Sequence, residues 1–318
     1  MAGRKRKNKY TIIILVLILL ISGVVTYFQN KGNPEDENNT ETEHNWAQDF
    51  ADAGLLPGQT TASSDKGLTV EFIDVGQGDC TLIRCGNKNM LIDCGESEYY
   101  QVVKNYLKNN GISRLDIVVA THPHSDHIGG MYMLIEDFDI GTFIMPKLSK
   151  GNIPTTKTYL NMISSLKEKS LSPDYATVGK IYNLSDAEIE ILAPVNDSDE
   201  LNNMSVVCML TYGKSKFLFT GDAETPVESD MIKGGADLKC NVLKVGHHGS
   251  TTSTGEKFLK KADPDVAVIS VGEGNDYNHP HTKILDRLLK RDVTIYRTDE
   301  DGTLKFYVPS ETADIIYP

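Results

Sequence analysis

The order of hydrophobic and polar positions divides the chain into three parts. Residues 10–28 form one uncharged, mostly apolar run, and residues 29–66 have almost no hydrophobic periodicity. From residue 67 onward, short apolar runs alternate with amphipathic stretches. This last pattern predicts a folded domain over residues 67–318, preceded by a flexible linker over residues 29–66.

Within the domain, LTVEFIDVGQGDC alternates apolar and polar residues from Leu68 until it meets a Gly-rich turn, which predicts a strand. Further apolar or alternating runs predict strands at 116–120, 187–193, 241–245, 266–270 and 293–297. Two pairs of runs flank turn residues and predict hairpins, 80–85 with 90–93 and 206–211 with 216–220. Helical spacing occurs at 99–107, 155–168, 254–261 and 282–290, and we expect a further helix from Ile128. Interleaved strands and helices, with a hairpin early in each half, predict an α/β fold in which two sheets lie between helices.

The run at 10–28 is long enough to cross a bilayer. Its 19 residues would span about 28 Å as a helix, and five basic residues precede it in 1–9. A basic flank favours a cytoplasmic N-terminal tail. We therefore expect a single-pass anchor at the cell membrane with the domain outside. A cleaved signal peptide, which would give a secreted protein, is the main alternative, and a buried core helix is a weaker one.

Composition narrows the functional classes. The chain has 318 residues, 40% hydrophobic and 24% charged, which excludes both general disorder and a many-pass membrane protein. Five of the 32 basic residues lie in 1–9, which leaves 27 basic against 44 acidic side chains in the remainder. Such an acidic surface does not bind a long polyanion by bulk electrostatics, so a phosphate substrate would need a local cation such as a metal.

Five cysteines, an odd number without a CxxC pair, lie in strand-like apolar runs, and we expect buried free thiols. They are Cys80, Cys85, Cys94, Cys208 and Cys240.

Seven of the eight histidines fall into three short clusters, each after a predicted strand. The first, THPHSDH at 121–127, offers four imidazole or carboxylate groups in six residues, which are ligands that suit zinc, manganese or iron. The others are His247 with His248 and His279 with His281. Repetition of such residues at strand ends indicates a metal site with room for two ions.

Several acidic and loop residues allow two interpretations. Asp222, after the strand FLFT, could be a metal ligand or a helix cap. Asp79 and Asp93 could support a ligand histidine or belong to ordinary turns. Pro280 suits a structural loop around His279 and His281.

HPHSDH, FTGD and GHHGS, in this order, resemble the metallo-β-lactamase-fold hydrolases. VGQGDC, LIDCG, NNMSVV and NHPH narrow the resemblance to the branch that contains the soluble domain of the competence protein ComEC and related secreted phosphodiesterases. The resemblance covers about residues 67–310 and implies an αββα sandwich with two divalent metal ions, zinc or manganese.

The resemblance also implies a set of ligands. His122 and His124 match one metal site, Asp126 and His127 match the second, and Asp222 matches the bridging carboxylate. Either His247 or His248 matches the last ligand of the second site, and we prefer His247. The chain departs from the family at one position. Many family members have another ligand histidine before the bridging acid, and the matching residues of this chain, 202–205, are Asn-Asn-Met-Ser.

Roles in catalysis follow from the same site. Asp126 is expected to orient the attacking water, and His248 or His279 to donate a proton or to hold a phosphate. The expected substrate-binding residues are Ser250, Thr251, Asn278, Asn203 and Ser205.

The favoured function is a metal-dependent phosphodiesterase or nuclease, with extracellular DNA as one candidate substrate. One alternative is hydrolysis of a carbonyl ester or lactam. The other is a metal-containing module that binds nucleic acid without catalysis. The sequence does not identify a protein partner.

Overall fold

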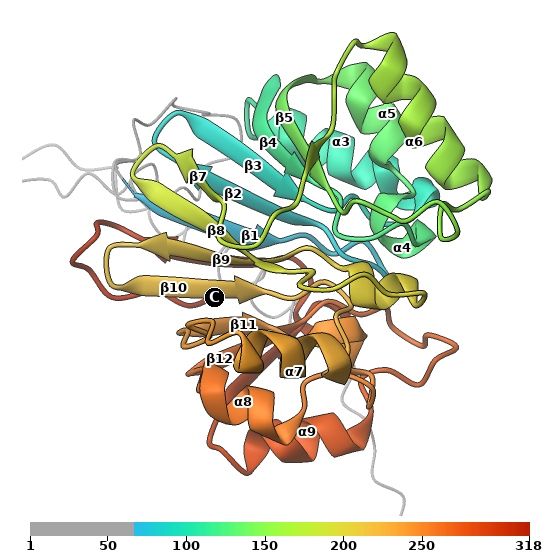
Figure 1. The fold of residues 1–318 in the computed structure, drawn as a ribbon. Helices are drawn as coiled ribbons and strands as arrows, with labels where there is room; N and C mark the ends of the chain where they lie inside the picture. Colours follow the sequence, from blue (N-terminus) through green and yellow to red (C-terminus); the bar gives the residue numbers. More distant parts are fainter. Residues whose placement is uncertain (1–66) are drawn as a thin grey trace, which may run out of the picture. The chain divides into compact units, whose positions relative to one another are not determined.

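Two seven-stranded sheets stacked face to face form the centre of the computed structural model, which describes residues 67–318 (Figure 1). The first sheet has the order β14 (Leu304–Val308), β1 (Leu68–Phe72), β2 (Thr81–Cys85), β3 (Lys88–Ile92), β4 (Arg114–Val119), β5 (Asp139–Met145) and β6 (Asp174–Tyr175). The second has the order β13 (Thr294–Arg297), β12 (Val266–Ile269), β11 (Val242–Lys244), β10 (Ser215–Phe219), β9 (Val207–Tyr212), β8 (Ala187–Ala193) and β7 (Ile181–Leu184).

Helices cover the outer face of each sheet (Figure 1). The first sheet carries α3 (Tyr100–Asn109), α4 (Ser125–Ile128), α5 (Met131–Asp137) and α6 (Lys157–Glu168). The second carries α7 (Thr225–Lys233), α8 (Glu256–Ala262) and α9 (Thr282–Leu289), and the short α10 (Thr298–Asp301) follows β13. Single 3₁₀ turns occur at η1 (Ser97–Tyr99) and η2 (Leu201–Met204), and the short segment η3 (Gly246–Gly249) contains two residues with positive φ.

Three apolar layers hold this arrangement together. In β1, Leu68, Val70 and Phe72 point to the interface between the sheets, where they join Phe217 and Phe306. This is the alternation that a strand imposes on successive side chains. Separate layers join each sheet to its own helices. The order helix, sheet, sheet, helix confirms the predicted αββα sandwich.

Most predicted elements are present, with shifted ends. Both hairpins form, but each turn is tighter than expected, because Cys85 pairs with Lys88 and Tyr212 pairs with Ser215. The helix expected from Ile128 is two short helices, α4 and α5. The strands β5, β7 and β14 were not predicted. All five cysteines are buried and free, as expected.

The predicted tail (1–9), anchor (10–28) and linker (29–66) lie outside the described residues. Over residues 67–318, no helix is both long and apolar enough to cross a bilayer.

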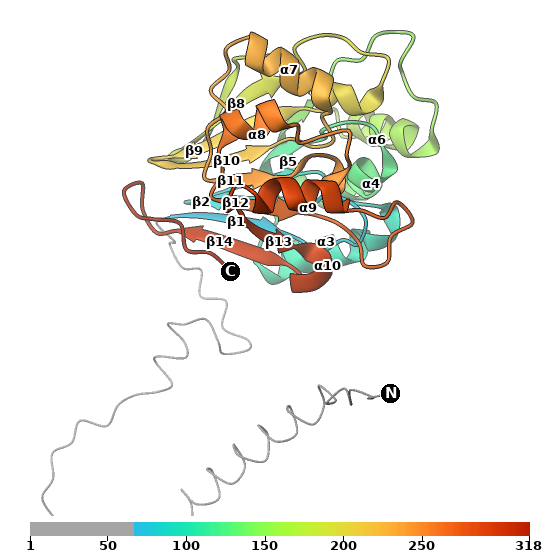
Figure 2. The same ribbon diagram turned by 90° about the horizontal axis from the view of Figure 1, so that it is seen from below.

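Parallel pairing brings the loops after several strands to one edge of the sandwich. In the first sheet β4 runs parallel to β3 and β5, and in the second β10, β11 and β12 run parallel to one another. The view from below shows β10, β11 and β12 of the second sheet beneath α8 and α9 (Figure 2). Side chains that follow these strands can therefore meet although they are far apart in the sequence.

Candidate metal centre

The loop after β4 delivers the first cluster of histidines. Pro123 keeps residues 121–124 out of a helix, and α4 begins only at Ser125, with His127 in its buried turn. Thr121 fastens this loop to the end of β3, because its backbone N–H and its hydroxyl both donate to the Asp93 carboxylate, at 2.8 and 2.6 Å.

Asp93 also orients the His127 ring. Its Oδ2 lies 2.7 Å from His127 Nδ1, which leaves Nε2 pointing into the site. Burial raises the pKa of Asp93, and the neighbouring His127 opposes that rise. A buried carboxylate behind a histidine is the usual way to fix the tautomer and the orientation of a metal ligand. The structure thus places Asp93 behind His127, where it supports the histidine instead of merely forming a turn.

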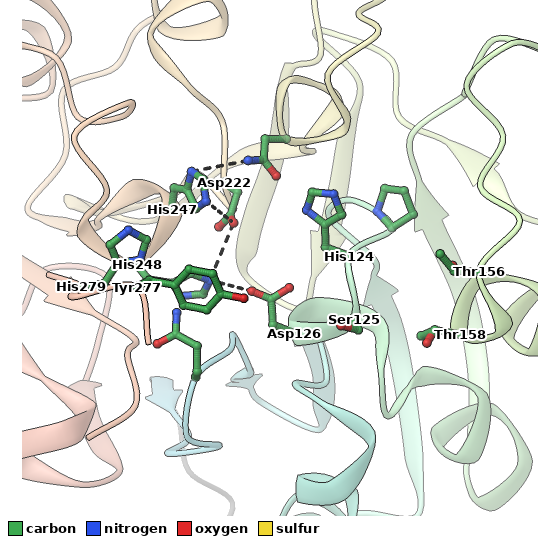
Figure 3. Close-up of a pocket in the computed structure, with 13 residues that line it drawn as sticks. His124, Ser125, Asp126, Thr156, Thr158, Asp222, His247, His248, Tyr277 and His279 are labelled. Carbon is green, nitrogen blue, oxygen red and sulfur yellow. Dashed lines mark hydrogen bonds and ion pairs between the residues drawn. The ribbon is translucent and has the colours of Figure 1, made fainter. Parts of the chain in front are cut away.

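Four side chains from three loops converge in front of this support. The ligand atoms of Asp126, His127, Asp222 and His248 all lie within 4.8 Å of one another. His127 Nε2 is 3.2 Å from Asp222 Oδ1. His248 Nε2 is 3.2 Å from Asp126 Oδ2 (Figure 3). His127 Nε2 and Asp222 Oδ1 are buried and make no hydrogen bond within residues 67–318. Buried polar atoms without a partner, in a set of imidazole and carboxylate groups, fit a divalent cation.

Electrostatics at this cluster favour positive charge. Burial lowers the pKa of His127, but Asp222, Asp126 and Asp93 outweigh it and hold that pKa well above its ordinary value. Burial also lowers the pKa of His248, which Asp222 and Asp126 again raise overall. Burial raises the pKa of Asp222, yet the facing imidazoles keep it well below its ordinary value. Protons on the histidines therefore compete with any cation that binds here.

The second member of the histidine doublet, not the first, joins the four-residue set. His248 is buried, and its Nδ1 lies 2.8 Å from the Ser270 carbonyl oxygen, which fixes the ring. His247 is partly exposed, with Nε2 3.6 Å from Asp222 Oδ2. Both residues have φ near +51°, a conformation that non-glycine residues adopt at a cost of roughly 1–3 kcal/mol and that is common at functional sites. This geometry disagrees with our preference for His247 as the last ligand.

His122 and His124 form a separate pair beside the cluster. His122 Nε2 lies 3.0 Å from His124 Nδ1 and 3.8 Å from Asp222 Oδ2. Burial and the neighbouring His127 lower the pKa of His122 well below its ordinary value, so its nitrogen is free to bind a metal. Asp222 therefore faces both groups, as expected of a bridging carboxylate.

Residues 202–205, which stand where many family members have a further histidine, support the Asp222 turn. Ser205 is fully buried and its hydroxyl accepts the Asp222 N–H at 3.1 Å, while Asn203 Oδ1 accepts the Glu224 N–H at 3.3 Å. Neither side chain lines the cavity described below. The two side chains thus support the backbone at 222–224, and their predicted role in substrate binding stays a prediction.

The site opens into a cavity of about 530 Å³. Six predicted site residues line it: His124, Asp126, Asp222, His247, His248 and His279. The sequence did not point to six other lining side chains, Gln77, Ser125, Thr156, Thr158, Asn202 and Tyr277. Thr156 and Thr158 lie across the cavity from His248 (Figure 3). The VGQGDC motif could have pointed to Gln77, whereas nothing local marks the two threonines.

Three expected phosphate-binding residues do not line this cavity. Ser250 is buried, with its hydroxyl 3.1 Å from that of Thr252, and the Thr251 N–H donates to His281 Nδ1. Asn278 lies between Tyr277 and His279, which line the cavity, but does not line it itself. His279 does line the cavity. Burial, and then the charges of His248 and His247, lower its pKa to about 4, so at neutral pH it presents an uncharged imidazole. An uncharged ring is a poor proton donor but a suitable hydrogen-bond partner.

Comparison with known proteins agrees with this geometry. A model of the Metallo-beta-lactamase superfamily matches residues 73–273. ComE operon protein 3 of Bacillus subtilis is 30% identical over 276 residues, 77% of this chain and 35% of that protein. Competence protein ComA of Neisseria gonorrhoeae is 29% identical over 257 residues, 80% of this chain and 34% of that protein. The chain thus spans about a third of the length of these relatives.

A solved structure of the CmlA β-hydroxylase of Streptomyces venezuelae shares the fold, with a TM-score of 0.52 at 14% identity over 85% of this chain and 60% of that one. The αββα sandwich and its cluster of histidine and aspartate define the class, and the chain belongs to the metallo-β-lactamase superfamily of metal-dependent hydrolases. Within that superfamily the relatives confirm the predicted resemblance to the ComEC-like competence proteins.

Proposed function

We propose that the chain is a metal-dependent phosphodiesterase that acts on nucleic acid. The observation that carries the proposal is the set formed by Asp126, His127, Asp222 and His248, which opens into the 530 Å³ cavity beside the pair of His122 and His124. Competence proteins among the relatives favour a nucleic-acid substrate over a lactam.

Two divalent ions, zinc or manganese, fit the donors present. We assign Asp126, His127, Asp222 and His248 to one ion and His122, His124 and Asp222 to the other. When bound, such ions supply Lewis acidity and lower the pKa of water toward neutrality. This assignment moves His248 from proton donor to ligand, because its Nε2 faces Asp126 and its Nδ1 is held by Ser270.

The remaining chemistry belongs to side chains of the cavity. Asp126 presents a carboxylate at the entrance of the site and is placed to orient the attacking water. His247 and His279 offer uncharged imidazoles to the phosphate oxygens, because burial lowers the pKa of both. The oxygen of water bonds to phosphorus as the ester P–O bond breaks, the attacking water gives up one proton to solvent, and the departing oxygen takes up one proton from solvent.

The test combines metal analysis with a choice of substrates. Full-length protein would be assayed with bis-p-nitrophenyl phosphate, DNA and nitrocefin in zinc or manganese. We expect diester turnover that Asp126→Ala abolishes and that Asp314→Asn, a change at a 94% exposed carboxylate far from the site in sequence, leaves intact. Turnover of nitrocefin alone would favour the lactam alternative, and bound metal without any turnover would favour a binding module.

We also propose that residues 10–28 anchor the protein in the cell membrane with the domain outside. The support is the uncharged 19-residue run that follows five basic residues. Fractionation and N-terminal sequencing of the mature protein test it. A mature protein that is released to the medium and begins after residue 28 would contradict the anchor.

A further inference from the structure

Tyr277 is an exposed aromatic residue at the wall of the candidate active site. Its exposed fraction is 64%, yet it lines the same cavity as Asp126 and His248. One face of the ring packs on His279, with the ring centroids 5.7 Å apart and the planes 22° from parallel. Figure 3 shows the Tyr277 ring on the side of the cavity where His279, His248 and Asp126 lie. A ring stacked on one side and highly exposed has its other face free.

A network centred on Asn275 fixes the loop that carries this ring. Asn275 Oδ1 accepts the backbone N–H groups of both Tyr277 and His279, at 3.1 and 3.0 Å. Its Nδ2 donates to the carbonyl oxygens of Gly272 and His279, at 3.0 and 2.6 Å. A single side chain therefore fixes the backbone of both residues whose rings stack.

The same loop is tied to the opposite sheet. The Gly272 N–H donates to Gln77 Oε1 at 3.1 Å, which joins the loop after β12 to the turn after β1. Among residues 67–318, His279 Nδ1 is buried and has no hydrogen-bond partner. Tyr277 and His279 thus form a built surface beside the metal centre.

Charge around the cavity limits what this surface can bind. No lysine or arginine is found among the described residues that line it. A duplex held along its backbone needs several such contacts, since phosphate neutralisation supplies most of its affinity. Stacking of single bases on aromatic rings is the other general source of affinity for nucleic acid, and it requires bases freed from a duplex.

We propose that Tyr277, backed by His279, is a stacking platform for one nucleobase next to the phosphodiester that is cleaved. The substrate class is therefore single-stranded nucleic acid, and this inference rests on the proposed phosphodiesterase function. Tyr277 contacts the base and sets specificity, while the metal ligands act on the phosphate. The acidic composition of residues 67–318 is consistent with a site that recognises a base locally instead of a long polyanion.

The experiment compares two backbones of equal charge. Full-length protein, loaded with manganese, would be assayed on a twelve-residue oligothymidylate and on the same backbone with abasic sites throughout. We expect kcat/KM to be about tenfold higher for the oligothymidylate, within the range that one stacked base contributes. Tyr277→Ala is expected to remove this preference by lowering the value for the oligothymidylate alone, and Tyr277→Trp to keep it.

Tyr175→Ala, at an exposed tyrosine that does not line the cavity, is the matched control and should leave the preference unchanged. Equal rates on the two backbones in the wild type, or a preference that survives in Tyr277→Ala, would overturn the platform. So would an equal loss on both backbones, which would indicate a structural role. p-Nitrophenyl phosphocholine would be assayed beside the two backbones. If Tyr277→Ala lowered kcat/KM for this diester alone, the platform would be overturned and Tyr277 would be assigned to a quaternary ammonium group by a cation–π contact.

Binding separates failure of the platform from failure of the proposed function. Fluorescence anisotropy of the two labelled backbones, measured in EDTA, needs no turnover. If no diester is cleaved but the oligothymidylate still binds more tightly and Tyr277→Ala removes the difference, the platform holds and the enzymatic function fails. Equal binding of the two backbones would contradict the platform whatever the activity.

Discussion

Lys244 places its ammonium group 2.5 Å from a carboxylate oxygen of Asp79, and the two side chains are 2% and 7% exposed. This ion pair lies directly beneath the metal centre, because the same Asp79 carboxylate is 3.5 Å from His248 Nδ1 and 3.8 Å from His127 Nδ1. Asp79, one of three acids for which the sequence allowed two interpretations, therefore lies behind His127 and His248 and pairs with a lysine from β11.

The ion pair gives the first prediction. Lys244→Met or Asp79→Asn alone should reduce the free energy of unfolding by about 3–5 kcal/mol, since each leaves one buried charge without its partner. The double variant should recover much of that loss. Chemical denaturation of the four proteins measures the coupling, and purely additive changes would contradict it. Lys214→Met, in an exposed pair with Asp314, should change stability far less.

The second prediction concerns pH and metal. The pKa values of His127 and His248 are raised in the metal-free site, so both imidazoles hold protons that a cation must displace. Metal affinity should therefore rise as pH is raised through these pKa values, and binding should release protons. Calorimetry in two buffers of different ionisation heat measures that release. A pH-independent affinity would argue against these ligands, and His281→Gln, outside the cluster, should leave the profile unchanged.

Glu228, a buried acid of α7, gives the third prediction. Burial raises its pKa to about 7, although the backbone N–H groups of Thr254 and Gly255 donate to it and oppose that rise. Because the folded-state pKa lies above the ordinary value of 4.5, its contribution to stability is fully present below about pH 4.5 and is lost as pH rises through about 7.

The expected loss is about 3 kcal/mol, from a shift of roughly two and a half pKa units. Glu228→Gln should flatten this part of the stability profile, which thermal unfolding at pH 5 and pH 8 would measure. Glu256→Gln, at an exposed acid, is the control and should leave the profile as it is. An unchanged slope in Glu228→Gln would show that other groups govern it.

A fourth prediction follows from the close approach of two loops. The Asp79 N–H donates to the Asp126 carbonyl oxygen at 3.1 Å, and a Cβ on Gly78 would collide with that oxygen. Gly78→Ala should therefore displace Asp126 and weaken metal binding at least tenfold, measured by titration with a chelator. Gly151→Ala, where a Cβ meets no atom within 4 Å, should bind metal normally. Normal binding in Gly78→Ala would show that the loops can separate without loss of the site.

Local patterns predicted the parts of the site that depend on local structure. HPHSDH, FTGD and GHHGS each follow a buried strand, and parallel pairing brings such strand ends together. The interfacial strand β1 shows the same agreement: all five of its residues are buried, and the alternating apolar ones, Leu68, Val70 and Phe72, form the face that joins the layer between the sheets.

The rest depends on tertiary contacts that no spacing encodes. The choice between His247 and His248 is made by the carbonyl of Ser270, 22 residues after His248, and the role of Ser205 by its bond to Asp222, 17 residues later. Gln77 meets Gly272 across 195 residues of sequence. Adjacent residues of the same type cannot be distinguished until such partners are known.

The metal centre takes His122 to His127 from the loop after β4 and takes Asp222 and His248 from loops of the other sheet. Bound ions would therefore link the two sheets, because their ligands come from connections of both. Chelation should leave the helices and strands in place and yet speed amide hydrogen exchange in these connections. Loss of the ions would then be the first step by which the two halves come apart.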